Sequence, residues 1–317
     1  MSAFDIPIVL CLYNRPDFTR QVLASLHHLE PARIFVVADG PKQDNAVDHQ
    51  KCDEVIGLVE QIDWTSNIEW NIADSNLGCR KRIQSGLSWV FDHVEEAIIL
   101  EDDCVPHPSF FPFCAELLDR YRLDPRVALI GGTNVQFNAD CGTASYFFSR
   151  YPLQWGWAAW RRTWDMYSPD ADAWDQLRDT RWLFDILQDP LAVAYWRTIF
   201  DQARAGFDTW DFSMTFSCWH AGALVIQPSR NLVTNIGFGP DATHTRDVGS
   251  VCANMPVYEM KFPLAHPDRV ERSVACDERT ERTAFSRTAR IRLQSMKDAL
   301  RDRKEPSRWT LDASDRS

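Results

Sequence analysis

The first hundred residues alternate between short apolar runs and segments of helical periodicity, and no other feature limits the fold as much. Apolar runs of the length expected for buried strands occupy 6–12, 33–38 and 97–100. Helical segments stand between them, and one opens with Pro16, a residue favoured in the first turn of a helix. Repeated strand–helix units favour a mostly parallel sheet with right-handed crossovers. The sequence therefore predicts an α/β fold with a Rossmann-like central sheet flanked by helices.

The chain after Pro108 follows a less regular pattern. Aromatic residues crowd the segment 144–166, which we expect to pair as strands, and residues 174–205 are expected to be helical. A further helix is predicted over 210–220. The loop at 231–244 is a candidate lid, because its glycines give it freedom to close over a site.

Composition narrows the range of partners. The formal net charge of −11 argues against nucleic acid as a main partner, because phosphate binding needs a basic face. The nine cysteines form no CxxC pair and their number is odd, which predicts reduced thiols in a cytoplasmic protein. No signal peptide is recognisable, and no apolar stretch approaches the ~20 residues that span a bilayer. We therefore expect a soluble protein.

Three consecutive acids, Glu101, Asp102 and Asp103, follow the apolar run at 97–100. Adjacent carboxylates repel one another unless a cation lies among them. Mg²⁺ and Mn²⁺ prefer carboxylate oxygens and often share their coordination with substrate phosphates. Ligands of open α/β sheets bind in the crevice at the carboxyl ends of the strands, which is where these acids are expected. The acid run is therefore a candidate metal–diphosphate site, with an acidic surface turn as the alternative.

Three other loops are expected to end at the same crevice. Asn14 and Arg15 precede a helix, and a guanidinium beside a helix N-terminus favours a phosphate. Asp39 ends the second predicted strand and could accept a hydrogen bond from a base or a ribose hydroxyl. Each feature alone also fits a surface residue or a simple turn. The third loop is a glycine turn with neighbouring cations, made of Asn76, Gly78, Arg80 and Lys81.

The order of these motifs resembles that of GT-A type glycosyltransferases, in particular family 2-like proteins, and the form of the acid run resembles N-acetylglucosaminyltransferase I. The resemblance implies a GT-A fold over residues 1–265, with a nucleotide-binding half over about 1–108 and a smaller acceptor-side half over about 109–265. The charged tail at 266–317 matches no part of these families, and we expect it to be helical or partly disordered. Its acids dilute its basic charge, so a peripheral membrane contact has only weak support.

The same resemblance implies roles for the loop residues. Asp103 would be the direct ligand of Mn²⁺ or Mg²⁺, with Glu101 and Asp102 in support. Asp39 would lie at the nucleobase and Arg15 near the diphosphate.

Three residues of the second half take roles from the resemblance as well. Trp157 lies in a Gly-Trp segment similar to one that lines the donor sugar, although tryptophan is also a frequent core residue. Asp211 follows Trp210 as the family's catalytic base does, whereas its place at a predicted helix N-terminus also fits a cap. His244 resembles a late histidine that adds a metal ligand in related enzymes, and a surface histidine is the alternative.

Together these features predict an inverting, metal-dependent transferase. It would move a hexosyl or N-acetylhexosaminyl group from a nucleotide sugar, with UDP as the expected nucleotide, to a hydroxyl of a glycan or other acceptor. By resemblance, the setting is the synthesis of bacterial surface glycans. One alternative is a non-catalytic nucleotide- or sugar-binding module. Another is a sugar nucleotidyltransferase, which usually carries a glycine-rich loop with a basic residue where this chain has Tyr13–Pro16.

Overall fold

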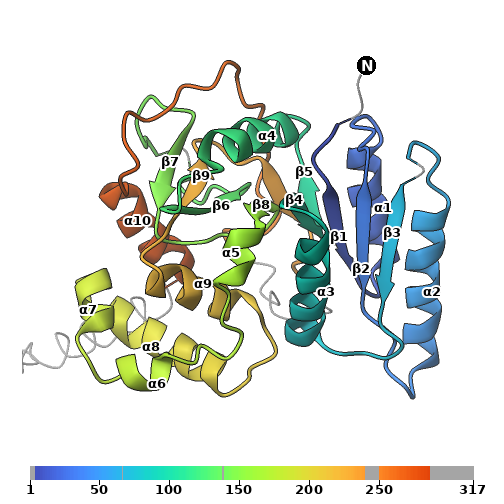
Figure 1. Ribbon diagram of the computed structural model, residues 1–317, viewed down its shortest axis with the longest axis horizontal. Coiled ribbons are helices and arrows are strands. Elements are labelled where there is room, and N and C mark those ends of the chain that lie inside the picture. Colours follow the sequence, from blue (N-terminus) through green and yellow to red (C-terminus); the bar gives the residue numbers. More distant parts are fainter. Residues whose placement is uncertain (1–3, 66, 138, 240–249, 286–317) are drawn as a thin grey trace, which may run out of the picture.

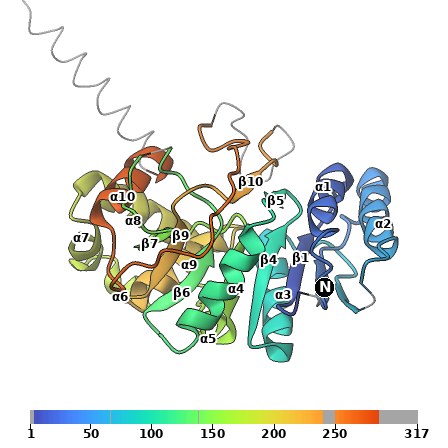
Figure 2. The same cartoon turned by 90° about the horizontal axis from the view of Figure 1, so that it is seen from above.

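A computed structural model describes residues 4–65, 67–137, 139–239 and 250–285 of the chain. Its centre is an eight-stranded sheet in the order β3-β2-β1-β4-β8-β6-β9-β7, with helices on both faces (Figure 1, Figure 2). A separate two-stranded sheet joins β5 and β10. This arrangement confirms the predicted α/β class.

The first half of the sheet is entirely parallel, as predicted. Strand β1 pairs with β2 and β4, and β2 pairs with β3. Because these strands share one direction, their carboxyl ends meet at one edge of the sheet. The strands are β1 (Ile8–Leu12), β2 (Ile34–Ala38), β3 (Ile68–Ile72) and β4 (Glu96–Glu101), and the helices between them are α1 (Pro16–Leu26), α2 (Ala46–Glu60) and α3 (Cys79–His93).

The side chains of β1 divide the hydrophobic core into two layers. Ile8 and Leu10 pack in the layer that α1, α2 and α4 (Phe110–Tyr121) cover on one face of the sheet. Val9 and Cys11 belong to the layer on the other face, which α3 and helices of the second half cover. This alternation is the two-residue period of a strand, and burial on both faces explains the continuous apolar run in the sequence.

The second half extends the sheet with strands of both directions. Strand β8 runs antiparallel to its neighbours β4 and β6, β6 and β9 are parallel, and β7 forms the edge, antiparallel to β9. The sheet is thus parallel in its first half and mixed in its second. The elements are β6 (Val127–Gly131), β7 (Tyr146–Ser149), β8 (Trp157–Trp160), α5 (Arg161–Asp165), α6 (Trp174–Leu177), α7 (Trp182–Leu187), α8 (Pro190–Arg204), α9 (Asp211–His220) and β9 (Leu224–Pro228).

The aromatic segment 144–166 forms two strands, as predicted, but they do not pair with each other. Every residue of β8 is buried, and the strand takes a central position between β4 and β6. Strand β7 instead lies three places further on, at the sheet edge. The helices expected over 174–205 and 210–220 are present as α6, α7, α8 and α9.

A short antiparallel ladder follows the acid run. Strand β5 (Cys104–Pro106) pairs with β10 (Val233–Asn235). Asn231, just before β10, accepts a hydrogen bond from the backbone amide of Asn134 at 3.0 Å and donates one to the carbonyl of Pro256 at 3.1 Å. The first part of the candidate lid is therefore fixed in the body of the protein, and residues 240–244 lie outside the described residues.

Residues 266–285, the described part of the C-terminal segment, pack on the second half of the body. Helix α10 (Val274–Thr280) continues into a π-helical turn at Glu281–Phe285. Asp277 on α10 is almost fully buried and accepts hydrogen bonds from Ser149 Oγ at 2.6 Å and Arg150 Nε at 3.3 Å. These contacts join the segment to the end of the edge strand β7.

A disulfide joins Cys141 to Cys276, which corrects the expectation that all cysteines are reduced. The two residues are 135 positions apart in the sequence, and the docking of α10 on the body brings them together. No spacing motif in the sequence indicates this pairing. Six other cysteines are free thiols: Cys11, Cys52, Cys79, Cys104, Cys114 and Cys218. Within the described ranges, no helix has both the length and the apolar character needed to cross a bilayer.

We expect Asp277→Asn to change how stability depends on pH. Burial raises the pKa of Asp277 from 3.8 to about 6, although a hydrogen bond from Ser149 and the charge of Arg150 oppose the shift. Between these pH values the folded chain keeps a proton that the unfolded chain has released, so the free energy of unfolding falls as the pH rises. Relative to the variant, the native chain should lose about 2–3 kcal/mol between pH 4 and 7. Urea unfolding measures this, and a pH-independent difference would contradict it.

Candidate active site

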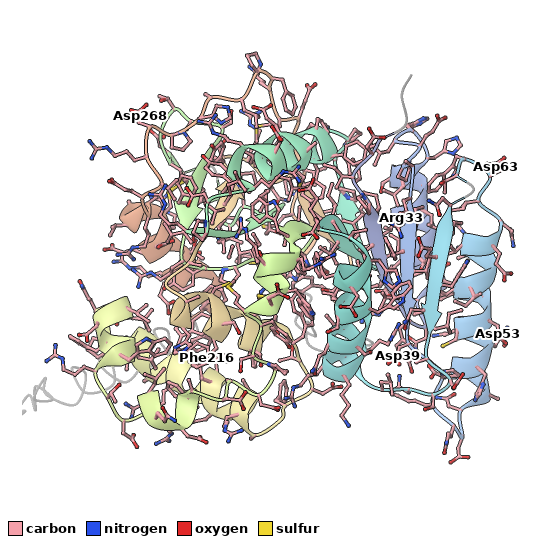
Figure 3. All side chains as sticks on the ribbon, viewed as in Figure 1. Arg33, Asp39, Asp53, Asp63, Phe216 and Asp268 are labelled. Atoms are coloured by element: carbon pink, nitrogen blue, oxygen red, sulfur yellow. A yellow bond between two sulfur atoms is a disulfide. The ribbon has the colours of Figure 1, made fainter. Side chains whose placement is uncertain are left out.

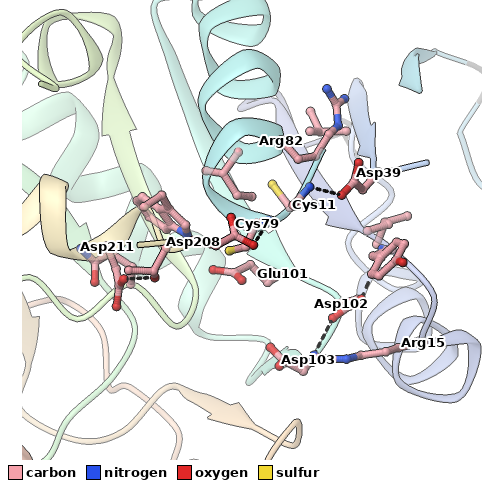
Figure 4. A pocket seen from close by; sticks show the side chains of 18 of the residues that line it. Cys11, Arg15, Asp39, Cys79, Arg82, Glu101, Asp102, Asp103, Asp208 and Asp211 are labelled. Atoms are coloured by element: carbon pink, nitrogen blue, oxygen red, sulfur yellow. Dashed lines mark hydrogen bonds and ion pairs between the residues drawn. The ribbon is translucent and has the colours of Figure 1, made fainter. Parts of the chain in front are cut away.

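One pocket lies at the carboxyl ends of β1, β2 and β4, where α3 and α9 begin (Figure 4). Its volume is about 320 Å³. Strand β2 belongs to the first half of the chain and α9 to the second. Figure 3 labels one residue of each region, Asp39 at the end of β2 and Phe216 on α9. The pocket gathers most of the predicted site residues: Arg15, Asp39, Asn76, Gly78, Glu101, Asp102, Asp103 and Asp211.

Arg15 contacts the acid run directly. Its Nη1 atom lies 2.9 Å from Oδ2 of Asp103 and 3.3 Å from Oδ1 of Asp102. The Asp102 carboxylate also accepts a hydrogen bond from the backbone amide of Tyr13 at 3.3 Å. The loop after β1 thus supplies one full charge and one amide dipole to the acids at the end of β4, and these offset part of their mutual repulsion.

Arg15 does not offset the whole negative charge of the acid run. Burial raises the pKa of Glu101 well above its usual range, and the charges of Asp103, Asp102 and Asp211 add to the effect. Burial also raises the pKa of Asp102 to about 7, although the charge of Arg15 opposes the shift. A further cation among these oxygens would stabilise their ionised forms.

The ladder of β5 and β10 forms the wall beside Asp103. Asn235 donates a hydrogen bond from Nδ2 to Oδ1 of Asp103 at 3.2 Å, and the amide of Ile236 donates to the Asp103 carbonyl at 2.9 Å. Gly237 packs so closely that a β-carbon there would lie 2.0 Å from Oδ2 of Asp103. Asn235 therefore holds one carboxylate oxygen and Arg15 the other. His244, the second predicted metal ligand, lies outside the described residues.

Asp39 is engaged by the loop beside it. Its Oδ1 atom accepts hydrogen bonds from the backbone amides of Gly40 and Leu77, both at 2.9 Å. Its Oδ2 atom accepts one from the amide of Gly78 at 3.1 Å and one from Nδ2 of Asn76 at 2.9 Å. Asp39 thus anchors the turn before α3 to the end of β2. Its contact with a nucleobase stays a prediction.

Asn14 and Arg80 are not among the residues that line the pocket, and their place in the donor site stays a prediction. The side chain of Asn14 donates a hydrogen bond to Asp48. The guanidinium of Arg80 donates to the carbonyl of Pro169 at 3.0 Å and pairs with Asp170. Each side chain is held by a polar partner outside the pocket.

Trp157 is also absent from the lining and packs in the core, and its contact with a donor sugar stays a prediction. The side chain is fully buried and stacks on Trp210, with ring centroids 5.4 Å apart. As a residue of β8, the strand between β4 and β6, it packs into the hydrophobic layer on the α3 face. The neighbouring Trp155 lines the pocket instead.

Asp211 begins α9 on the side of the pocket opposite Arg15 (Figure 4). Its Oδ1 atom accepts hydrogen bonds from the Thr209 hydroxyl and, at 3.0 Å, from the amide of Phe212. The cap position of α9 belongs to Trp210, so Asp211 is the first helical residue and not the cap. The carboxylate is oriented by its own turn and faces the space that the acid run also faces.

Three charged residues that line the pocket were not identified as site residues from the sequence: Lys42, Arg82 and Asp208. Arg82 is buried, donates to the side chain of Asn71 at 2.7 Å, and has an Nε atom without a partner among the described residues. The basic cluster at 80–82 gave a signal for it. The sequence contains no such signal for Asp208, because no motif near it connects it with the acid run.

The carboxylate oxygens that line the pocket are ligands of the kind that hard divalent cations prefer. Such ions bind through one or two carboxylates and complete their coordination with water and substrate phosphates. Over the described ranges, no group of three or more His, Cys, Asp or Glu side chains is arranged to enclose a metal. Phosphate ligands would therefore have to complete the shell. The pocket has six carboxylates (Asp39, Glu101, Asp102, Asp103, Asp208 and Asp211) against three basic side chains (Arg15, Lys42 and Arg82).

No protein-family model matches the sequence, and no curated protein gives a significant match. Similar solved structures include glucosyl-3-phosphoglycerate synthase from Mycobacterium tuberculosis in complex with Mn²⁺, UDP and phosphoglyceric acid, at 14% identity and a TM-score of 0.34, over 64% of this chain and 78% of that one. A mannosyltransferase from Pyrobaculum calidifontis in complex with GDP-Man and Mn²⁺ has 10% identity and a TM-score of 0.37, over 68% and 69%. TarS from S. aureus has 12% identity and a TM-score of 0.36, over 72% and 98%. Similarities of this size assign neither a family nor an activity.

We expect Arg15→Leu to destabilise the chain by leaving buried carboxylates without their cation. Removing one partner of a buried ion pair costs 3–5 kcal/mol, so about 2–3 kcal/mol is expected for Arg15, whose side chain is 21% exposed. Adding Asp103→Asn should recover part of this loss, because the double variant no longer buries that charge. Urea unfolding of the single and double variants measures the coupling.

Arg20→Leu is the matched control for this experiment. Arg20 lies on α1, the helix that Arg15 precedes, but it pairs with Asp17 and Glu54 near the surface, and its side chain is 52% exposed. Its replacement should cost no more than about 1 kcal/mol. Equal losses for the two arginine variants would contradict the role given to Arg15.

Proposed function

We propose that the chain is an inverting glycosyltransferase that uses a divalent cation to transfer a sugar from a nucleoside diphosphate to a hydroxyl group. The observation that carries the proposal is the pocket, which places the acid run, Arg15 and Asp211 around one space of about 320 Å³. A nucleotide sugar needs cations beside its diphosphate, and the attacking hydroxyl needs a base. The acid run with Arg15 and the Asp211 carboxylate lie on opposite sides of the space (Figure 4).

The charge of the lining supports a requirement for metal. Even with Glu101 protonated, five other carboxyl groups face three basic side chains in the lining, so a diphosphate would be repelled unless a further cation accompanied it. Asp103 would hold Mn²⁺ or Mg²⁺, with Glu101 and Asp102 in support, and the positive charge of the ion would stabilise the departing diphosphate.

Arg15 supports the diphosphate side of the site. It immediately precedes α1, so its guanidinium and the helix N-terminus both favour an anion near the end of β1. Arg15 pairs with Asp102 and Asp103. A diphosphate beside the acid run would share this guanidinium with them.

Asp211 supports the acceptor side of the site. It would take the proton from the acceptor hydroxyl while the oxygen attacks the anomeric carbon, a general-base step worth about 10²–10⁴-fold. The bond from that carbon to the phosphate oxygen would break on the opposite face, toward the acid run. Attack and departure on opposite faces invert the configuration at the carbon.

The finer identity of the substrates follows the resemblance. We propose UDP as the nucleotide, a hexosyl or N-acetylhexosaminyl group as the sugar, and a glycan hydroxyl as the acceptor, in the cytoplasmic synthesis of bacterial surface glycans. Incubating a panel of nucleotide sugars with the protein and Mn²⁺ tests the donor, because slow hydrolysis reports it before the acceptor is known. Consumption of a nucleoside triphosphate and a sugar phosphate instead would favour the nucleotidyltransferase alternative.

Binding of UDP should depend on Mn²⁺ and on Asp103. In calorimetry, Asp103→Ala should weaken UDP binding in Mn²⁺ on the order of 100-fold, because even second-shell changes at metal sites cost 10–100-fold. Asp53→Ala, on the exposed side of α2 (Figure 3), is the control and should bind normally. UDP binding of equal strength with and without Mn²⁺ would exclude the metal-dependent mechanism.

Asp211→Asn should separate catalysis from donor binding. The amide keeps the shape of the side chain but cannot accept a proton, so sugar transfer should fall on the order of 10²–10⁴-fold. UDP affinity in Mn²⁺ should stay within about threefold of the native value, since Asp211 lies opposite the diphosphate side. Loss of UDP affinity with unchanged turnover would show that Asp211 belongs to the donor site and not to the acceptor site.

A further inference from the structure

Asp208 connects the two halves of the chain at the edge of the pocket. It lies three residues before Asp211, and its carboxylate reaches the first turn of α3. Oδ1 accepts a hydrogen bond from the amide of Arg80 at 2.9 Å, and Oδ2 accepts one from the amide of Cys79 at 3.3 Å. These amides have no partner within the helix, because the first turn of any helix leaves its N–H groups unpaired.

Asp208 therefore serves as the cap that α3 lacks in its own sequence. The residue at the cap position is Gly78, which has no side chain to offer. A carboxylate at this place is also favoured by the positive end of the helix dipole. The cap comes from a segment about 130 positions further along the chain.

Gly78 leaves the space that the Asp208 carboxylate occupies. A β-carbon at Gly78 would lie 2.7 Å from Oδ2 and 2.9 Å from Oδ1 of Asp208. Gly78 also has a φ of +81°, a conformation that other residues rarely adopt. Glycine at this turn thus permits the contact between the two halves.

A second tie holds the same two helices together. The carbonyl of Pro169 accepts hydrogen bonds from Arg80 at 3.0 Å and from the Ser213 hydroxyl at 2.7 Å. Arg80 lies in the first turn of α3 and Ser213 in the first turn of α9. The starts of the helices are therefore coupled at Pro169 as well as at Asp208.

The segment between Asp208 and Asp211 is tightly held. Thr209 is buried and donates its hydroxyl to Asp211, and Trp210 is buried in its stack on Trp157. A shift at Asp208 would therefore be passed on to the carboxylate that faces the acid run.

We propose that Asp208 is a positioning residue for Asp211. By capping α3, which begins beside the acid run, it sets the distance between the proposed base and the proposed donor site. This inference rests on the proposed function. Asp208 is no candidate for the base itself, because both of its oxygens are bound by backbone amides of α3.

Two variants separate the cap from the charge. Asp208→Ala removes the cap, whereas Asp208→Asn removes the charge but keeps an oxygen that can accept from the first turn. In the proposed transfer, or in donor hydrolysis with Mn²⁺, Asp208→Ala should lower kcat on the order of 10- to 100-fold, as small misplacements of catalytic groups do. Asp208→Asn should restore kcat to within about threefold of the native value.

Asp189→Ala is the matched control. Asp189 caps α8 in the same way, accepting from the amides of Leu191 at 2.9 Å and Ala192 at 3.4 Å, but it does not line the pocket. Its loss should lower the melting temperature about as much as the loss of Asp208, because both variants remove one helix cap. It should leave kcat unchanged.

Hydrogen exchange supplies a readout that needs no substrate. Asp208→Ala should speed exchange at the amides of Cys79 and Arg80 and leave UDP affinity in Mn²⁺ unchanged. Asp208→Asn keeps one acceptor oxygen, so it should keep one of these two amides protected. The control Asp189→Ala should leave these two amides as they are in the native chain.

The inference is overturned if Asp208→Ala turns over at the native rate, or if Asp208→Asn is as slow as Asp208→Ala. The second result would show that the charge acts directly. Other results would contradict the proposed function itself: full transfer activity in Asp211→Asn, or UDP binding of equal strength with and without Mn²⁺. A native rate for Asp208→Ala together with an inactive Asp211→Asn would reject the positioning role alone.

Discussion

The repulsion among Glu101, Asp102 and Asp103 is the constraint on which the site depends. A strand that is buried along its length delivers three carboxylates to one point, and the chain surrounds them with partners from distant segments. Arg15 comes from the loop after β1 and Asn235 from the β10 ladder. The negative charge that remains uncompensated would favour a cation at this edge of the sheet.

The fold of the first half could be predicted because each of its elements leaves a local signal. Buried parallel strands appear as continuous apolar runs, and strand–helix alternation leaves few possible topologies. The aromatic segment 144–166 was harder, because pairing partners are not local. Its two strands were expected from their composition, but the central place of β8 depends on β4 and β6, which lie on either side of it.

The candidate site was predictable to the level of loops but not of every side chain. The carboxyl ends of parallel strands lie at one edge of the sheet. The loops that hold Arg15, Asp39 and the acid run were therefore expected to lie close together at that edge. The sequence offered a choice of cations on α3, and the buried one in the pocket is Arg82 rather than Arg80. Contacts such as that of Asp208 with α3, or the Cys141–Cys276 disulfide, connect segments with no common motif and appear only in three dimensions.

The direction of β8 has a consequence for the edge of the sheet that holds the site. Because β8 is antiparallel to both β4 and β6, those two strands run the same way, and β9 follows β6 in parallel. The carboxyl ends of β6 and β9 therefore continue the same rim that begins at the acid run. Residues 132–136, which follow β6, are buried, so the chain itself covers this part of the rim and leaves the pocket beside β1, β2 and β4.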